Sequence, residues 1–247
     1  SKGLILSPLG NVDVTAYKML LSYQSLWTGY RNTIFYIILS CVITGVLTII
    51  AGFVFSRNRF FYRNTFMLII SFTMLFNGGM IPTYMVIRNI GMVDTIWALV
   101  VPGALSVFNI ILMRTSMQEI SDSLEEAARL DGANDFVIMF KIVLPLCKAT
   151  FAVIMLFTIV MKWNDYMSAL LYLPTKTELY PLQMELRKIL FQSTKEITSA
   201  SDVSSSTVYA RNVEYGAIVI STLPILCVYP FVQKYFVTGM TIGAVKA

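Results

Sequence analysis

The sequence predicts an all-α integral membrane protein. Of its 247 residues, 56% are hydrophobic and 13% are charged, whereas soluble domains carry about 25% charged residues. The mean hydropathy is +0.69. One segment, Ile34–Phe55, contains no charged residue, and as a helix it is long enough to cross a hydrocarbon core of about 30 Å. Composition alone therefore assigns the chain to a membrane.

The charge and the reactive side chains disfavour several classes of function. The net charge of +5 comes from basic residues that lie mainly beside apolar segments, which is typical of orienting charges rather than of nucleic-acid binding. There is no histidine, and Cys41, Cys147 and Cys227 lie far apart, which disfavours a metal site, a disulfide framework and a histidine-based catalytic centre. No Gly-x4-Gly-Lys-Ser/Thr loop is present, so any nucleotide chemistry belongs to another chain.

The first third of the chain predicts one outer segment and one span. Ser1–Tyr30 has mixed composition and is interpreted as an extracytoplasmic segment near the membrane surface. Ile34–Phe55 is the first span. The loop after it carries Arg57, Arg59 and Arg63 and no acidic residue. By the positive-inside rule this loop is cytoplasmic.

The next two spans are predicted to be irregular. Thr65–Ile87 is interrupted by Asn77-Gly78-Gly79 and by Pro82. Such breaks are tolerated in a membrane where protein or a water-filled cavity satisfies the freed backbone groups. Thr95–Met113 is the third span, with a bend at Pro102-Gly103. It delivers the chain back to the side of the arginine loop.

The fourth span is predicted to include polar residues. The apolar run from Ala149 to Met161 is too short to cross alone, so the span is expected to cover Pro145–Tyr166. On a helix, Lys162 and Asp165 can pair on one face. Charges at membrane depth usually face a bundle interior or an aqueous path. The alternative is that these two residues only mark the outer interface.

The remaining chain is predicted to hold one exposed region and one span. Residues 167–212 are expected to be extracytoplasmic, with an amphipathic helix over Tyr180–Gln192. Tyr215–Phe231 is the last span, and Lys234 and Lys246 after it place the C-terminus inside. This topology has five spans with the first residue outside.

Between the third and fourth spans lies a polar, helix-prone hairpin, residues 114–148. Ser121-Asp122-Ser123 supplies candidate N-caps, with Glu125 or Glu126 at capping-box spacing. Gly132 is expected to end or bend this first helix. A second short helix is predicted over residues 134–142, stopped by Leu144-Pro145. The small side chains of the hairpin let a partner approach the backbone closely, and Glu126 offers an ionic contact.

The spacing of this hairpin resembles the cytoplasmic coupling loop of membrane subunits of ABC importers. Glu126-Ala127-Ala128, three residues, Gly132, nine residues, Ile142, one residue and Leu144-Pro145 match the pattern without departure. An ordinary amphipathic loop between spans is the alternative interpretation. The residues that the resemblance assigns to ATPase coupling are Glu126, Ala127, Ala128, Asp131, Gly132, Ile142, Leu144 and Pro145.

Three further motifs resemble the carbohydrate-importer subset of that family, in particular the maltose-type inner subunit. They are Asn77–Tyr84, Trp163–Tyr166 and Gln233–Lys246. The resemblance implies a type I importer permease, one domain over residues 1–247, with a sixth span N-terminal to residue 1. It also implies a bacterial cell-membrane location, a homologous second permease, two ATPase subunits that hold ATP and magnesium, an extracytoplasmic solute-binding protein, and a sugar or oligosaccharide substrate. This chain itself would bind no cofactor and catalyse no reaction.

A sugar site needs aromatic faces and polar groups in a mostly preformed cavity. Each candidate has packing as its alternative role. A non-sugar solute, an ion-coupled secondary transporter and a membrane enzyme remain as other functions, although a secondary transporter would not need the coupling loop. The candidate substrate-path residues are Asn77, Tyr84, Trp163, Asn164, Asp165 and Tyr166.

Overall fold

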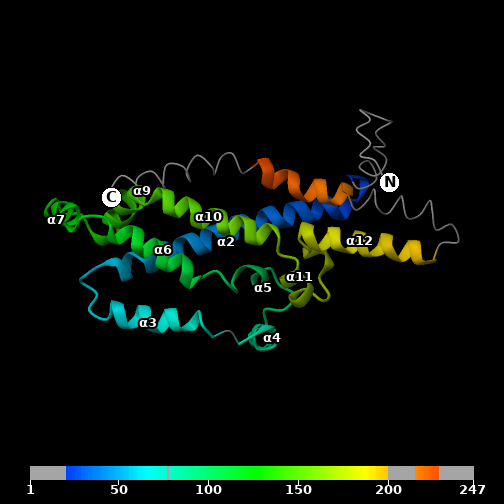
Figure 1. The fold of residues 1–247 in the computed structure, drawn as a ribbon, viewed down its shortest axis with the longest axis horizontal. Coiled ribbons are helices and arrows are strands. Elements are labelled where there is room, and N and C mark those ends of the chain that lie inside the picture. Colours follow the sequence, from blue (N-terminus) through cyan, green and yellow to red (C-terminus); the bar gives the residue numbers. More distant parts are fainter. Residues whose placement is uncertain (1–20, 77, 200–214, 228–247) are drawn as a thin grey trace, which may run out of the picture.

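The computed structural model describes residues 21–76, 78–199 and 215–227. Within these ranges the chain forms helices joined by turns and contains no strand, which confirms the predicted all-α class. The bundle is elongated, and its longest helix, α2 (Gln24–Ser56), runs through its middle (Figure 1). Predictions at residues 1–20, 77, 200–214 and 228–247, which include Asn77 and the motif at 233–246, lie outside the described residues.

Helix α2 begins earlier than the predicted first span and has two unlike faces. Its buried face consists mainly of small and polar residues, whereas its exposed face is largely apolar. Small residues at a helix interface let backbones approach, and the apolar face suits lipid. The buried face includes Gly29, Thr33, Ser40, Thr44, Thr48 and Gly52, and the exposed face includes Ile34, Ile38, Val42, Ile50 and Val54.

The second span is broken, as the sequence predicts. Helix α3 (Arg63–Thr73) and helix α4 (Met80–Asn89) are separated by an irregular stretch that ends at Gly79. Gly79 has a φ of +88°, which only glycine adopts readily. The predicted second interruption at Pro82 is wrong, because this proline lies in the first turn of α4, where its missing N–H has no helical partner to lose.

The third span is also broken, at the predicted position. Helix α5 (Trp97–Val100) and helix α6 (Val107–Gln118) flank Pro102-Gly103. Helix α6 continues past Arg114, where the sequence predicts that the coupling loop begins. The loop therefore starts later than predicted, because the buried side chains of Met113 and Met117 hold that turn against α2.

The fourth span is shorter than predicted. Helix α10 (Lys148–Trp163) follows a bend of 83° at Cys147, and helix α11 (Met167–Tyr172) starts a new direction. Lys162 and Asp165 form no ion pair, because α10 ends between them, although the negative charge of Asp165 still acts on the Lys162 ammonium. The Lys162 ammonium donates to the Leu99 carbonyl, and a carboxylate oxygen of Asp165 accepts from the Ser168 N–H at 3.0 Å.

Length and composition identify few complete crossings among the described residues. Helix α2 alone is long and apolar enough to cross a membrane, and residues 135–146 together with α10 pass the same test as a bent pair. The last described helix, Tyr215–Cys227, is apolar but shorter. The number of spans therefore stays a prediction.

The predicted amphipathic helix is present and packs on the first half of α2. Helix α12 (Leu182–Ser199) follows the short turn η2 (Thr177–Leu179). The side chains of Leu182, Leu186 and Ile189 are buried on one face, as expected. The Leu182 N–H donates to the Thr33 hydroxyl at 2.8 Å, which fixes the start of α12 against α2.

A close contact between α2 and α6 gives a first testable prediction. A methyl group at Gly52 of α2 would lie 2.8 Å from Cγ and 3.0 Å from Cβ of Met113 in α6. Gly52→Ala is therefore expected to destabilise the fold by about 1–3 kcal/mol, as overpacking does. Lower thermal unfolding midpoints of the purified protein would report this loss.

A second glycine of α2 supplies the matched control. At Gly45 the nearest atom is the tip of the Phe151 ring, at 3.3 Å, and this side chain can rotate away. Gly45→Ala is expected to be neutral or stabilising, since alanine suits a helix interior better than glycine by about 0.5–1 kcal/mol. Equal midpoints for the two variants would contradict the proposed close packing of α2 and α6.

Candidate functional site

One short helix protrudes from the end of the bundle. Helix α7 (Asp122–Leu130) begins after Ser121, so the predicted helix start is confirmed (Figure 1). The predicted capping boxes are wrong. Ser121 is the N-cap residue, its side chain bonds to that of Ser123 at 2.7 Å, and it makes no cap hydrogen bond to the backbone.

Gly132 ends α7, as the sequence predicts. The Ala133 N–H donates to the Ala128 carbonyl at 2.9 Å, and the Gly132 N–H donates to the Arg129 carbonyl at 3.0 Å. This is the Schellman pattern, which places a left-handed residue after the helix. Gly132 has a φ of +84°, and a Cβ built on it meets nothing within 4 Å. The turn therefore presents bare backbone on its outer side.

The second helix of the hairpin runs further than predicted. Asn134 caps it, because its side-chain oxygen accepts from the Val137 N–H at 2.9 Å. Helix α8 (Asp135–Val137) continues into a π-helix, η1 (Ile138–Val143), and then into α9 (Leu144–Leu146). Pro145 does not stop the helix, which bends only at Cys147. The wider π-helical turn relieves the clash that the proline ring would make with the carbonyl of Lys141.

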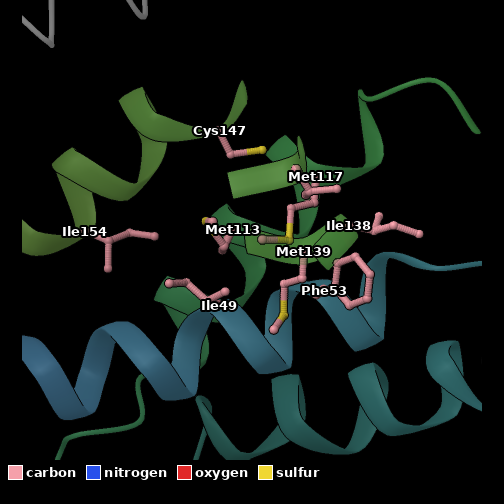
Figure 2. Close-up of a cluster of buried hydrophobic side chains, with 9 residues drawn as sticks. Ile49, Phe53, Met113, Met117, Ile138, Met139, Cys147 and Ile154 are labelled. Atoms are coloured by element: carbon pink, nitrogen blue, oxygen red, sulfur yellow. The ribbon is translucent and has the colours of Figure 1, made fainter. Parts of the chain in front are cut away.

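This second helix is anchored in the core of the bundle. Figure 2 shows its buried side chains packed against residues of α2, α6 and α10. Helix α7, by contrast, contributes no residue to the buried part of this cluster. The second helix of the hairpin is therefore in direct contact with three long helices. The cluster consists of Ile49, Phe53, Met113, Met117, Ile138, Met139, Val143, Cys147 and Ile154.

An ion pair that sequence reasoning missed ties α7 to the end of α2. The guanidinium of Arg57 pairs with the carboxylate of Glu125, and both side chains are largely buried. Beside it, the Asn58 amide donates to Asp122 at 3.2 Å. The sequence predicts only an orienting charge at Arg57 and only a capping-box residue at Glu125. The contacts confirm that the arginine loop and the hairpin lie at the same end of the molecule.

A separate cavity of about 600 Å³ lies between the middle helices. Its wall includes Lys162 and Asp165 at the end of α10, Asn109 from α6 and the aromatic side chains of Phe108 and Phe157. Phe108 and Phe157 form a tilted pair with ring centroids 6.5 Å apart. The cavity thus combines an apolar wall with a few polar groups, as ligand sites do.

Comparison with known proteins identifies the family. Residues 45–242 match the family described as "Binding-protein-dependent transport system inner membrane component". The chain belongs to this family. The chain is therefore a membrane-embedded transport subunit, and the all-α membrane class that the sequence predicts is confirmed.

Several individual proteins are similar over most of their length. The permease is 38% identical to the "Polygalacturonan/rhamnogalacturonan transport system permease protein YtcP" of Bacillus subtilis (strain 168), over 100% of this chain and 86% of that protein. It is 36% identical to "Protein LplC" of the same organism, over 94% of this chain and 78% of that protein. A solved bacterial ABC transporter involved in the import of the acidic polysaccharide alginate has a TM-score of 0.82 at 36% identity, covering 92% of this chain and 81% of that chain.

The predicted coupling residues of the permease fall into two groups. Five are exposed on the hairpin, whereas Ala128, Ile142 and Leu144 are partly buried against the core cluster. The first group has the position needed for contact with a partner, and the second has the position needed to anchor the hairpin. The exposed residues are Glu126, Ala127, Asp131, Gly132 and Pro145.

The predicted substrate-path residues do not gather at one place. Trp163 is 6% exposed, packs among α2 and α12 residues, and donates from its indole N–H to the Ser221 carbonyl at 2.9 Å. The ring is thus part of the core of this chain, and its role in the substrate path stays a prediction. Asn164 is exposed and donates to the Val160 carbonyl at 2.8 Å, which caps α10.

The other candidates have separate neighbours. Tyr84 stacks on Tyr172 with ring centroids 6.3 Å apart. The Tyr166 ring lies under the Arg187 guanidinium, 4.7 Å from its carbon to the ring centroid. Of these residues, Asp165 alone lines the cavity of about 600 Å³. No cluster of metal-ligating side chains is found in the part of the chain that the structure describes.

Proposed function

We propose that this chain is the permease subunit of an ATP-driven importer for a sugar or oligosaccharide, in which the protruding hairpin docks on a partner ATPase. The observation that supports the proposal is that the two parts of the hairpin have different surroundings. One part offers bare backbone and exposed side chains to a partner, and the other part is packed into the bundle. ATP and magnesium are held by the ATPases, and this chain is non-catalytic.

The hairpin surface has the composition of a docking site. Leu130 is 89% exposed and Phe136 is 67% exposed, on either side of the open turn at Gly132. Large apolar side chains gathered at an exposed position usually mark a protein interface. Glu126 lies on the same helix and is exposed, so it is available for an ionic contact with a basic partner residue.

The substrate class follows from the relatives. One similar permease is named for polygalacturonan and rhamnogalacturonan transport, and a solved transporter of similar fold is named for alginate. Other similar permeases are named for arabino-oligosaccharides and lactose. The remaining partners are a second, homologous permease and an extracytoplasmic solute-binding protein, as the family description implies. A non-sugar solute, the alternative, has no support from these relatives. Residues 114–148 face the cytoplasm and residues 167–212 the outside in a multi-pass bacterial cell-membrane protein.

The orientation is testable by cysteine labelling. Single cysteines are placed at exposed Arg59, beside the hairpin, and at exposed Thr177, beside the start of α12, after the three native cysteines are replaced. An impermeant maleimide added to intact cells is expected to label position 177 and to leave position 59 unlabelled until the cells are opened. Labelling of position 59 alone in intact cells would place the hairpin outside, where no ATPase can reach it.

A further inference from the structure

We propose that Asp94 is a positioning residue that joins the outer ends of three broken spans into one unit, which shifts as a whole against α6 and α10 during transport. We call this unit, residues 80–100 and 167–179, the outer cap. It contains α4, α5, α11 and η2. This role rests on the proposed importer function and goes beyond it, since it names a moving part of this chain and the residue that holds that part together.

The second, third and fourth predicted spans are all broken between an inner and an outer helix. The breaks separate α3 from α4, α6 from α5, and α10 from α11. The three outer helices lie together on one side of the breaks (Figure 1), and their side chains share one buried cluster. The cavity of about 600 Å³ reaches two of the breaks, since Pro102, Gly103 and Asp165 line it. At each break the helical hydrogen bonds are interrupted, so the outer helix can change its angle to the inner one.

The outer cap has a buried core of its own. This outer core includes Ile87 of α4, Leu99 of α5 and Tyr172 of α11. The inner core, which Figure 2 shows, contains no residue of these three helices. Between the two cores lies the cavity, with Thr44 and Asn109 buried at its wall. Close-packed cores deform little, whereas a layer with a cavity and polar side chains deforms more readily, so movement is expected between the cores rather than within them.

Helix α2 connects the two cores. Its Tyr36 belongs to the outer core and its Ile49 to the inner core. The Lys162 ammonium of α10 also donates to the Leu99 carbonyl in the outer cap. These contacts hold the outer cap on the bundle, but none of them joins the turn after α4 to the segment after α11.

Asp94 makes that connection. Its carboxylate accepts from the Thr175 N–H at 3.0 Å, from the Thr175 hydroxyl at 2.9 Å and from the Lys176 N–H at 3.2 Å. Its own N–H donates to the Tyr172 carbonyl at 2.7 Å. The two joined segments are 81 residues apart in the sequence. Because one segment connects α4 to α5 and the other follows α11, a single side chain holds the outer ends of all three spans.

The backbone of Asp94 also points to a role for its side chain. Asp94 has a φ of +59°, and among the described residues no other residue except glycine has a positive φ. This conformation is uncommon for a residue with a Cβ atom, although aspartate and asparagine tolerate it best. Glycine would fit this turn with less strain. Aspartate at this position is therefore explained by the bonds that its carboxylate makes.

Distances between paired spin labels in the purified complex with its ATPases test this proposal. After the native cysteines are replaced, cysteines at Ile90 and Leu170 report on the inside of the outer cap, and cysteines at Ile90 and Thr115 report on the outer cap against α6. All three side chains are exposed. The solute-binding protein is present throughout. When ATP, magnesium and vanadate are added, the wild type is expected to change the second distance and to keep the first.

Two substitutions of Asp94 separate its carboxylate from its backbone conformation. Asp94→Gly removes the side chain and leaves the turn unstrained. It is expected to broaden the distance distribution between positions 90 and 170. It is also expected to lower uptake per ATP hydrolysed, on the order of tenfold, since three hydrogen bonds to a carboxylate are lost. Asp94→Asn is expected to resemble the wild type, because its amide oxygen can accept from both N–H groups and its amide nitrogen can donate to the Thr175 hydroxyl.

Glu178→Gln is the matched control. It removes an exposed carboxylate from the same end of the molecule, one that pairs with Lys176 at 3.7 Å, and it is expected to change neither the distances nor the uptake. Three outcomes would overturn the proposal. They are two wild-type distances that change alike, two that both stay fixed, and an Asp94→Gly variant that unfolds more easily but keeps wild-type uptake per ATP hydrolysed. The importer function is judged separately, by uptake of any oligosaccharide through the complete wild-type complex, so it can survive the loss of this proposal.

Discussion

Replacing Gly132 by aspartate is expected to abolish coupled transport while the chain still folds and enters the membrane. A Cβ at this position meets no atom within 4 Å, so the new side chain collides with nothing in the permease itself. It would project from the outer side of the turn between α7 and α8, where the proposed ATPase contact lies. Uptake is expected to fall by more than tenfold, because a residue at the centre of an interface commonly contributes about 2 kcal/mol or more.

Backbone strain must be separated from lost docking in this experiment. Aspartate at a φ of +84° is strained, at a cost of about 1–2 kcal/mol. Gly91 has a φ of +78°, is equally open, and lies in the turn after α4, far from α7 (Figure 1). Gly91→Asp therefore carries the same strain without touching the hairpin, and it is expected to transport normally.

The measurement combines uptake with co-purification of the ATPase. Gly132→Asp is expected to lose both, whereas Gly91→Asp is expected to keep both. Normal uptake and normal ATPase recovery in Gly132→Asp would contradict the coupling assignment. Equal losses in the two glycine variants would show that strain, not docking, is responsible.

The sequence predicts the local features of this fold well and the contacts between distant residues poorly. The breaks at Gly79 and at Pro102-Gly103 are predictable from local sequence. Glycine permits backbone conformations that other residues avoid, and proline fixes φ and lacks the N–H that a helix needs. The turn at Gly132 is predictable for the same reason. The end of α6 is not, because burial of Met117 against distant residues extends the helix past the polar positions.

In the candidate sites, too, local features could be predicted from the sequence and contacts between distant residues could not. The coupling hairpin is visible in the sequence because its spacing is local. The ion pair between Arg57 and Glu125 joins residues far apart in the chain, and nothing in either segment signals it. Trp163 was assigned to a cavity because the apolar run before it is short, yet α12 and the helix 215–227 cover it. Lys162 was noted as a charge at membrane depth, but its hydrogen bond to the Leu99 carbonyl joins residues far apart in the chain and could not be predicted.

Glu125→Ala is expected to give the largest loss of stability in the permease. The Glu125 carboxylate is buried beside the Arg57 guanidinium, whose carbon lies 4.9 Å from the centre of the Phe53 ring. Removing the acid leaves the cation buried without its partner, which costs about 3–5 kcal/mol. The thermal unfolding midpoint of the purified protein is expected to fall by on the order of 10 °C. Glu125→Gln, which keeps an oxygen acceptor near Arg57, is expected to lose less.

The pKa of Glu125 indicates how burial and the neighbouring Arg57 act on this carboxyl group. Burial raises the pKa of Glu125 above its ordinary value, and Arg57 offsets that rise only in part. A raised acid pKa means that the folded state favours the protonated form. The contribution of this group to stability is therefore present at low pH and lost as the pH rises through the raised pKa. At this carboxyl, desolvation thus outweighs the attraction of Arg57.

The double variant Arg57→Met/Glu125→Leu tests whether the ion pair only attaches α7 to α2 or is also needed to couple ATP hydrolysis to uptake. Apolar side chains of similar size remove both buried charges, so the unfolding midpoint is expected to return to the wild-type value or above it. If the ion pair is needed to hold α7 in one orientation on α2, the double variant is expected to be stable but to take up less substrate per ATP hydrolysed than the wild type. Recovery of uptake together with stability would show that any well-packed contact between α7 and α2 suffices. A midpoint as low as that of Glu125→Ala would contradict the explanation by a buried, unpaired Arg57, because the double variant contains neither charge of this pair.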